Sequence, residues 1–438
     1  MQYISQEYTI FAVYNQFEST MILRLIILSF LQFAVWGTYL TSMGSYLVNI
    51  GLADKIGLFY AMQGVVSLFM PALMGIIADR WIPAQRLLSI CHLLASLFMG
   101  LAGYYGMTAG NNLEFGSLFF YYSLGIAFYM PTLALSNSVS YNALDNSGLD
   151  AIAHFPRIRL FGTIGFICSM WIVDLCGLQD NYGQFLAYAA IGIVCSLYAL
   201  TLPSCPINTE KHQKSLYEAL GLHTFVLFKQ RRLAVFFIFS ILLGVSLQIT
   251  NGFANPYISS FASLPQYANT FGVQHANILI SLSQASEAFC ILLIPFCLKR
   301  WGIKRVIILA MLAWSLRFAL FGIGNPGNGV WMFILSMIVY GIAFDFFNIS
   351  GSLFVDREAN KHIRSGAQGL FFMMTNGFGA TLGNLGAQAI VSHFVDFNSK
   401  EPQIVGWQSA WLVFASYALF VAIAFALIFK NKETNNNH

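Results

Sequence analysis

The sequence predicts an all-helical membrane protein, and three observations carry this prediction. Only 9% of the 438 residues are Asp, Glu, Lys or Arg, and 57% are hydrophobic, whereas soluble domains carry about 25% charged residues. The mean hydropathy is +0.66. The apolar residues form continuous stretches about 20 residues long, as in a membrane-spanning helix, and not the short alternating segments of a membrane β-barrel. These features exclude a soluble enzyme, a nucleic-acid-binding protein and a disordered scaffold.

Apolar stretches of this length occur twelve times, separated by short breaks. The predicted spans cover about 22–48, 56–78, 85–107, 114–142, 158–177, 182–202, 233–259, 275–298, 304–323, 329–355, 364–392 and 407–429. At about 20 apolar residues per span, twelve spans use nearly the whole chain and leave no room for a sizeable soluble domain.

The longest polar stretch, at about 203–232, lies between the sixth and seventh predicted spans. We therefore expect two six-helix halves, at 21–202 and 233–430, joined by this central loop. Residues 1–20 contain two glutamates and no Lys or Arg, unlike a secretory signal peptide. We expect this leader to be disordered, or the native chain to begin at Met21.

The distribution of basic residues predicts the orientation in the membrane. When both chain ends, including the tail at 431–438, lie in the cytoplasm, 18 of the 22 Lys and Arg residues fall in cytoplasmic segments. Lys55 and Lys400 fall outside, and Arg159 and Arg317 fall within spans. Cytoplasmic loops are rich in Lys and Arg, and a miscounted span would remove this asymmetry. The bias supports both the count and the topology.

The two halves share a short basic turn after their second span, at 75–86 in the first half and 299–305 in the second. Two equivalent halves are typical of transporters that bind substrate near the middle of the membrane. The spacing of Gly75, Asp79 and Arg80 resembles the GxxxDR signature of the major facilitator superfamily.

Among the charged residues within the predicted spans we single out four: Arg159, Glu287, Arg317 and Asp345. A charge at the bilayer centre costs roughly 2.5–3.5 kcal/mol on insertion scales, so each is a functional candidate. For Arg317 we favour a structural role, either pairing with a neighbouring carboxylate or reaching toward the membrane interface. Asp174 lies near the outer end of its span, where we expect it to reach the interface.

Polar and aromatic residues share helix faces in four of the spans, because residues three or four apart lie on one face of a helix. The sets are Arg159, Thr163 and Phe166; Gln248 and Asn251; Gln284 and Glu287; and Tyr340 and Phe344. We expect these faces to line an aqueous cavity, although the amide pairs alone would also hold helices together. Amides, a carboxylate and aromatic rings suit a neutral solute with hydroxyl groups and a flat ring, such as a nucleoside, better than an anion.

Two intramembrane carboxyl groups, Glu287 and Asp345, offer a coupling mechanism. A carboxyl group partly withdrawn from water can take up a proton on one side of the membrane and release it on the other. The sequence contains no Walker motif, no metal-ligand spacing and no nucleophile–base pair within its spans. We therefore expect a proton-driven transporter without a cofactor or metal, and not an enzyme; sodium coupling is the alternative.

Six segments resemble the nucleoside:proton symporter family of the major facilitator superfamily. They are SFLQFAVWGTYLTSMGSY at 29–46, MPALMGIIADRW at 70–81, YMPTLALSNSVSY at 129–141, RLFGTIGF at 159–166, FFIFSILLGVSLQITN at 236–251 and SMIVYGIAFDFFNISGSLFV at 336–355. The resemblance implies proton-coupled uptake of purine and pyrimidine nucleosides across the bacterial inner membrane by alternating access. We expect nucleosides, protons and the lipid bilayer as partners, no nucleic acid, no obligate protein partner and a monomer.

The resemblance also implies roles for single residues. The nine residues of the four polar sets match the family's nucleoside contacts in type. Glu287 and Asp345 are the candidates for proton coupling, and Gly75, Asp79 and Arg80 resemble the superfamily's cytoplasmic gate. The alternatives are a xanthosine-preferring permease, a sugar or polyol:proton symporter, and a receptor or scaffold that does not transport.

Overall fold

The computed structural model describes residues 2–207, 222–360, 363–399 and 401–429. Over these ranges the chain forms helices joined by turns, without a strand. Nine of the described helices are long and apolar enough to cross a membrane, judged by length and composition. The expectation of an all-helical membrane protein is therefore confirmed for the described part of the chain.

The first half of the chain contains seven α-helices and two short 3₁₀ helices within the described ranges. They are α1 (Gln2–Gly37), α2 (Met43–Asn49), η1 (Ala53–Lys55), α3 (Ile56–Arg80), α4 (Ala84–Ala109), η2 (Gly110–Asn112), α5 (Phe115–Asn146), α6 (Ala151–Leu175) and α7 (Gly183–Ala199). The described elements of the second half are η3 (Leu222–Lys229), α9 (Arg231–Ser260), η4 (Phe261–Ser263), α10 (Phe271–Gln274), α11 (Ala276–Ile323), α12 (Val330–Glu358), α13 (Arg364–Phe372), η6 (Met373–Gly379), α14 (Ala380–Phe394) and α15 (Ile404–Ile428).

Helix α1 differs from the predicted first span at both ends. It begins at Gln2, so the leader is helical where we expected disorder, and it ends at Gly37, where we expected one span over 22–48. Gly37 packs against α6 so closely that a Cβ would collide with the backbone of Phe166. The hydroxyl of Thr38 then donates to Val35 O at 2.8 Å, which satisfies one carbonyl that the ended helix leaves without a partner. Turns over 38–42 lead into α2.

Helix α11 corresponds to two predicted spans, 275–298 and 304–323. Its 48 residues would extend about 70 Å if straight, more than twice the thickness of about 30 Å of the hydrocarbon core. The element bends at Gly302, where φ is 73° and ψ is 167°. Because only glycine adopts this conformation readily, the bend lies where the sequence places a basic turn between the two spans.

The predicted eleventh span, 364–392, is interrupted. Between α13 and α14, the segment η6 winds as a π-helix. A Cβ on Gly379 would lie 2.7 Å from Gly244 Cα, and one on Gly383 would lie 2.5 Å from Val245 O. Both neighbours belong to α9, so the GxxxG spacing at 379–383 serves close helix packing.

Contacts within the chain define two compact units. Unit 1 comprises Met1–Tyr39, Met70–Val173 and Tyr182–Gln213, and unit 2 comprises Leu40–Phe69, Asp174–Asn181 and Lys214–His438. These units differ from the expected halves at 21–202 and 233–430, because α2 and the first part of α3 group with the second half of the chain. The boundaries of the two halves stay a prediction.

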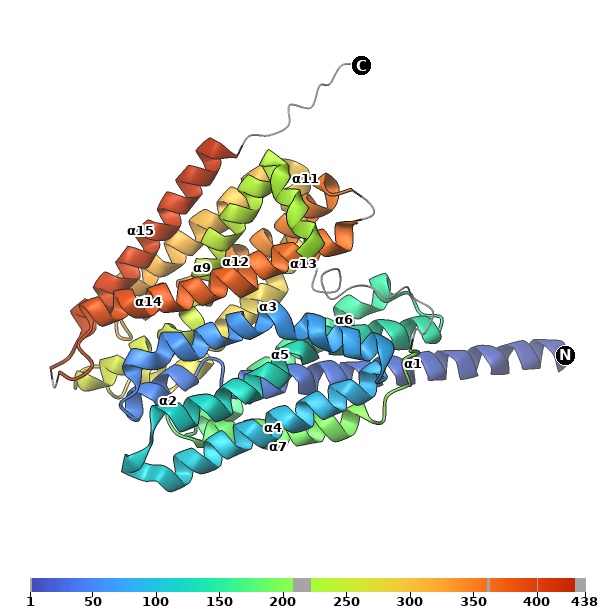
Figure 1. The fold of residues 1–438 in the computed structure, drawn as a ribbon, viewed down its shortest axis with the longest axis horizontal. Coiled ribbons are helices and arrows are strands. Elements are labelled where there is room, and N and C mark those ends of the chain that lie inside the picture. The colour runs from blue at the N-terminus through green and yellow to red at the C-terminus, as the bar shows by residue number, and fades with distance from the viewer. Residues whose placement is uncertain (1, 208–221, 361–362, 400, 430–438) are drawn as a thin grey trace, which may run out of the picture. The chain divides into compact units, whose positions relative to one another are not determined.

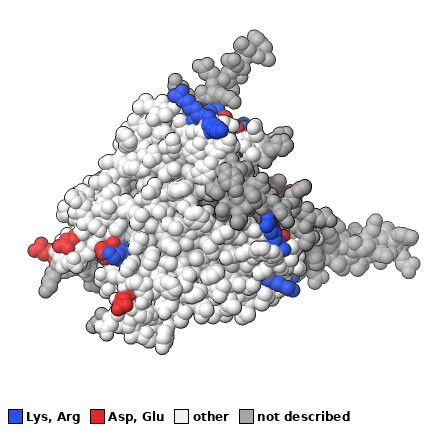
Figure 2. Space-filling view, viewed as in Figure 1, with Lys and Arg blue, Asp and Glu red and all other residues white. Residues whose placement is uncertain are grey.

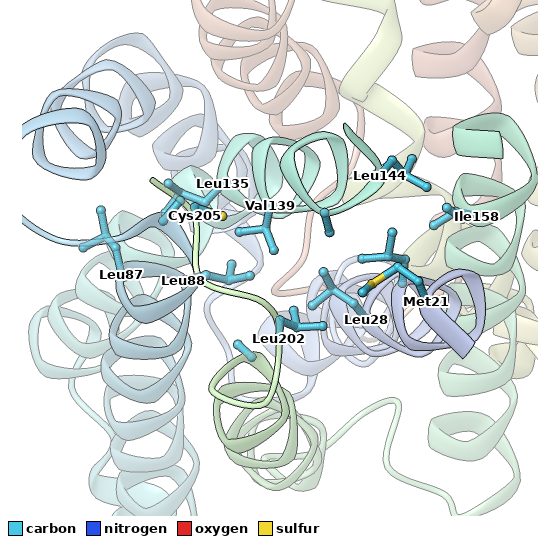
Figure 3. Packing of buried hydrophobic residues seen from close by; sticks show 14 of the residues in the cluster. Met21, Leu28, Leu87, Leu88, Leu135, Val139, Leu144, Ile158, Leu202 and Cys205 are labelled. Atoms are coloured by element: carbon cyan, nitrogen blue, oxygen red, sulfur yellow. The ribbon is translucent and has the colours of Figure 1, made fainter. Parts of the chain in front are cut away.

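Each unit has an apolar interior. In unit 1, α4 packs against both α5 and α7 (Figure 1). Figure 3 shows part of this interior, where Leu28 of α1, Leu88 of α4 and Val139 of α5 lie near Leu202, which follows α7. In unit 2, α11 packs against α12 and α15, and α9 packs against η6 and α14.

The surface is apolar over wide areas, and Figure 2 shows few charged side chains on the face that it draws. On α6, for example, Leu160, Ile164 and Trp171 are 45%, 39% and 46% exposed. An apolar surface of this extent is unfavourable in water and suits a lipid environment.

Candidate substrate-binding and coupling site

Glycines bring α6 against α1 in unit 1. A Cβ on Gly162 would lie 2.6 Å from Phe33 Cδ2, and one on Gly165 would collide with Phe30 O. With Gly37 opposite, the two helices approach to backbone contact. The sequence RLFGTIGF thus places Arg159 and Phe166 directly beside α1.

Two of the three predicted contacts on α6, Arg159 and Phe166, meet side chains of α1. The guanidinium carbon of Arg159 lies 3.8 Å above the centre of the Phe33 ring, a cation–π arrangement that contributes about 0.5–2 kcal/mol depending on exposure. Phe166 is 5% exposed, and its ring meets that of Trp36 edge-on at 6.2 Å. Thr163, which lies between Arg159 and Phe166 in the sequence, is half-buried. Sequence reasoning did not single out Phe33, although it shares a helix face with Trp36.

The amide pair on α9 is joined directly. Asn251 Nδ2 donates to Gln248 Oε1 at 2.6 Å, and both side chains are half-buried. The pair therefore bonds within one helix. This bond orients the carbonyl of Asn251 and the N–H₂ group of Gln248, which take no part in it.

In unit 2, the candidate residues of α11 and α12 lie around Tyr340. Its ring stacks on that of Phe344 at 5.4 Å and 20°. It interacts with the side chain of Gln284 and with the charges of Glu287 and Asp345. The close approach of the two helices permits this grouping, because a Cβ on Gly341 would lie only 2.6 Å from Ser286 O.

The two carboxyl groups differ in their surroundings. Asp345 is 4% exposed and lies within electrostatic range of Cys290 on α11. Glu287 is half-buried. Both lie within electrostatic range of Tyr340 in the aromatic stack, so a change of charge on either carboxyl group alters the electrostatic environment of this ring.

Two expectations about charged residues are wrong. Arg317 is 1% exposed, so it does not reach the interface, and it forms no ion pair with a described carboxylate. The side chain of Asp174 is fully buried and is paired with His275, where we expected it to reach the interface. In both cases the partners come from distant parts of the sequence.

The remaining candidates lie at helix ends. Asp79 and Arg80 are exposed at the end of α3, and Gly75 lies one turn earlier. At the end of α12, Glu358 pairs with Arg232 at 2.5 Å, and the neighbouring Asp356 pairs with Arg364 at 3.6 Å.

Long apolar helices whose packed faces carry amides, aromatic rings and carboxyl groups define a membrane transporter for a polar solute. Residues 19–434 match the family described as nucleoside H⁺ symporter. The chain belongs to the nucleoside H⁺ symporter family, which confirms the resemblance drawn from the six sequence segments.

Individual relatives agree with this membership. The chain is 45% identical over 414 residues to the nucleoside permease NupG of Escherichia coli (strain K12), which covers 94% of this chain and 96% of that protein. It is also 45% identical over 411 residues to the xanthosine permease of the same organism, covering 93% and 96%. A crystal structure of the nucleoside transporter NupG matches with a TM-score of 0.84 and 45% identity, covering 94% of this chain and all of that one. The protein is thus a transporter and not an enzyme.

Proposed function

We propose that this protein imports purine and pyrimidine nucleosides together with protons across the bacterial inner membrane by alternating access. The observation that carries the proposal is the grouping around Tyr340, where an amide and two carboxyl groups lie within electrostatic range of an aromatic stack. A site of this kind links the binding of a flat, hydroxyl-bearing solute to the charge of a titratable group. Membership of the nucleoside H⁺ symporter family supports the same function.

The substrate contacts of the proposal are the nine residues of the polar sets. In unit 2, the base stacks on the rings of Tyr340 and Phe344. In unit 1, Phe166 offers a further aromatic face, and Arg159 and Thr163 offer hydrogen-bond donors. The ribose hydroxyl groups bond to the amides of Gln248, Asn251 and Gln284 and to Glu287. Aromatic stacking and amide hydrogen bonds together favour a nucleoside over a free sugar.

Coupling in the proposal uses the two carboxyl groups and the proton gradient, without a cofactor. Glu287 is the better candidate for substrate-linked protonation, because it is half-buried and carried on the substrate-binding face of α11. Asp345 is buried and is suited to respond to helix movement. A protonated carboxyl group no longer carries the charge that makes reorientation within the membrane costly.

The proposed topology has twelve spans with both termini in the cytoplasm. The nine candidate helices, the division of α11 at Gly302, the apolar α7 and the interrupted segment from α13 to α14 support this count. The two six-helix halves are 21–202 and 233–430, with a monomer as the working unit. The turn with Gly75, Asp79 and Arg80 is the proposed cytoplasmic gate.

Equilibrium binding to the purified, detergent-solubilised protein tests the substrate. We expect saturable binding of uridine and adenosine and none of D-xylose. A Phe344→Ala variant should bind both nucleosides at least tenfold more weakly. The matched control is Phe289→Ala, because Phe289 is on α11 but 72% exposed. Binding of D-xylose without nucleosides would contradict the proposal, and binding of xanthosine alone would favour the xanthosine-preferring alternative that the equal identities leave open.

A further inference from the structure

Arg317 is a buried cation that has no role in the proposed transport mechanism. It lies on α11 beyond the bend at Gly302, and its side chain is 1% exposed. Arginine stays protonated in proteins, and a buried charge is unfavourable unless protein groups replace the lost water. Since no described carboxylate pairs with it, the compensation comes from neutral groups.

Hydrogen bonds tie the guanidinium to two neighbouring helical segments. Nη1 donates to Ser336 O at 2.8 Å and to Ser283 Oγ at 3.3 Å, and Ser336 Oγ donates to Arg317 O at 3.0 Å. Ser283 directly precedes Gln284, and Ser336 lies one turn before Tyr340 on α12. Arg317 therefore connects the two segments that carry the candidate substrate contacts of unit 2.

The aromatic contacts of Arg317 are centred on the same tyrosine. Its Cζ lies 4.6 Å from the centre of the Tyr340 ring, compared with 5.7 Å for Phe321 and 5.9 Å for Trp314. A cation over an aromatic face is attracted by the ring, and most strongly where water is excluded. Trp314 meets the Tyr340 ring edge-on at 5.8 Å and 90°. The ring of Tyr340 is thus restrained by one cation and by one indole.

The guanidinium is not fully hydrogen-bonded in this position, because its Nε has no hydrogen-bond partner in the described structure. An unsatisfied buried donor is destabilising, so the compensation for the buried charge comes from the bonds of Nη1 and from the contact with the Tyr340 ring.

We infer that Arg317 is a positioning residue that sets the orientation of the Tyr340 ring and, through the stack with Phe344, of the surface that receives the nucleobase. This inference rests on the proposed function, because it assigns the stack to the base. Lysine does not replace arginine here, since only the planar guanidinium lies over the Tyr340 ring while its Nη1 bonds Ser336 and Ser283, whereas an ammonium group is a compact point charge.

A double-mutant cycle tests the inference by equilibrium binding of uridine and by initial rates of uptake. Arg317→Lys retains the charge and should raise both Kd and KM about tenfold, the order expected for a buried cation–π contact, while Vmax per folded transporter stays within twofold. In a Tyr340→Leu background, Arg317→Lys should change Kd less than twofold, because the ring that it positions is absent. Lys304→Gln is the matched control: Lys304 is also on α11 but bonds Ala426 O on α15 at 3.0 Å, and its Kd should equal that of the unmodified protein.

The possible results separate the two claims. An unchanged Kd in Arg317→Lys, or a tenfold effect that persists in the Tyr340→Leu background, would overturn the positioning role while uridine binding by the unmodified protein upholds the proposed function. A fall in folded protein and Vmax with an unchanged KM would mean a structural role only, and would also overturn the inference. Failure of the unmodified protein to bind any nucleoside would overturn both.

Discussion

Nδ1 of His275 donates to Oδ1 of Asp174 at 2.6 Å, and the carboxylate of this pair is fully buried. Oδ2 of the same carboxylate accepts the backbone N–H of Asn277 at 3.1 Å. Asp174 belongs to unit 2, in the short segment Asp174–Asn181. The residue therefore fastens a segment of the first half of the chain to the beginning of α11.

A polar network extends from this pair within unit 2. Asn277 Oδ1 accepts hydrogen bonds from Asn255 Nδ2 at 2.7 Å and from Thr41 Oγ1 at 3.1 Å. Asn255 Oδ1 in turn accepts from Ser45 Oγ at 2.6 Å. In the proposed topology these residues lie toward the outer side of the membrane, so the network is expected to keep α2 and the turn before it closed against α9 and α11 on that side.

Asp174→Asn should weaken this closure, because it removes the carboxylate that binds His275 and replaces one buried acceptor by an N–H₂ donor that faces backbone N–H groups. We expect a loss of stability of about 1–3 kcal/mol and faster reaction of an introduced Ser45→Cys thiol with a membrane-impermeant maleimide. The measurement uses a Cys176→Ser background, because Cys176 is exposed. Asp180→Asn, at an exposed position of the same segment, is the control; equal labelling rates in all variants would count against the closure.

Gly244→Ala should destabilise the packing of α9 against η6. A Cβ at this position would lie 2.5 Å from Thr375 O and 2.9 Å from Gly379 Cα, and backbone atoms cannot move aside as a flexible side chain can. We expect a loss of about 1–3 kcal/mol in denaturant unfolding in detergent. Gly386→Ala on α14 is the matched control, because its Cβ would meet no atom within 4 Å; similar losses in the two variants would show that the close approach is not the cause.

Phe33→Leu should weaken nucleoside binding although Phe33 is outside the nine predicted contacts. The substitution removes the ring beneath the Arg159 guanidinium, 3.8 Å away, and with it the cation–π attraction that helps to orient the charge. We expect the Kd of uridine to rise about fivefold, the lower part of the range for a cation–π contact. Phe161→Leu alters an exposed phenylalanine of α6 and should leave Kd unchanged. An effect of Phe161→Leu as large as that of Phe33→Leu would refute the specific role of the Arg159 contact.

Glu287→Gln should abolish concentrative uptake while nucleoside exchange across the membrane continues. The amide retains hydrogen-bonding capacity but neither binds nor releases a proton between pH 5 and 8. Proteoliposomes loaded with unlabelled uridine give the exchange rate, and a pH gradient gives accumulation. Undiminished accumulation in this variant would remove Glu287 from the coupling mechanism, and the same test on Asp345→Asn would then identify the alternative.

The sequence predicts the helical spans because a continuous apolar stretch is a local property that lipid demands. It also predicts which residues share a helix face. Gln248 pairs with Asn251 three residues later, and Tyr340 stacks on Phe344 four residues later, as this periodicity predicts. The end of α1 at Gly37 is different, because it depends on contact with Phe166, more than a hundred residues away.

The same limit explains the two errors on charged residues. No sequence feature near Asp174 indicates its contact with His275, and none near Arg317 indicates its contact with the Tyr340 ring. A position within a span does not distinguish among pairing, exposure at the interface and contact with a ring. Phe33 lacked a signal of its own, since an aromatic residue in an apolar stretch is ordinary; its spacing of three from Trp36 was the only indication.

Uptake of radiolabelled uridine and adenosine into cells that lack their own nucleoside transporters, with and without a protonophore, tests the central claim most directly. The account predicts accumulation above the external concentration and its collapse when the protonophore is added. Uptake that merely equilibrates, with the same final level in the presence of protonophore, would contradict proton coupling. An absence of uptake of either nucleoside by folded, membrane-inserted protein would contradict the proposed substrate.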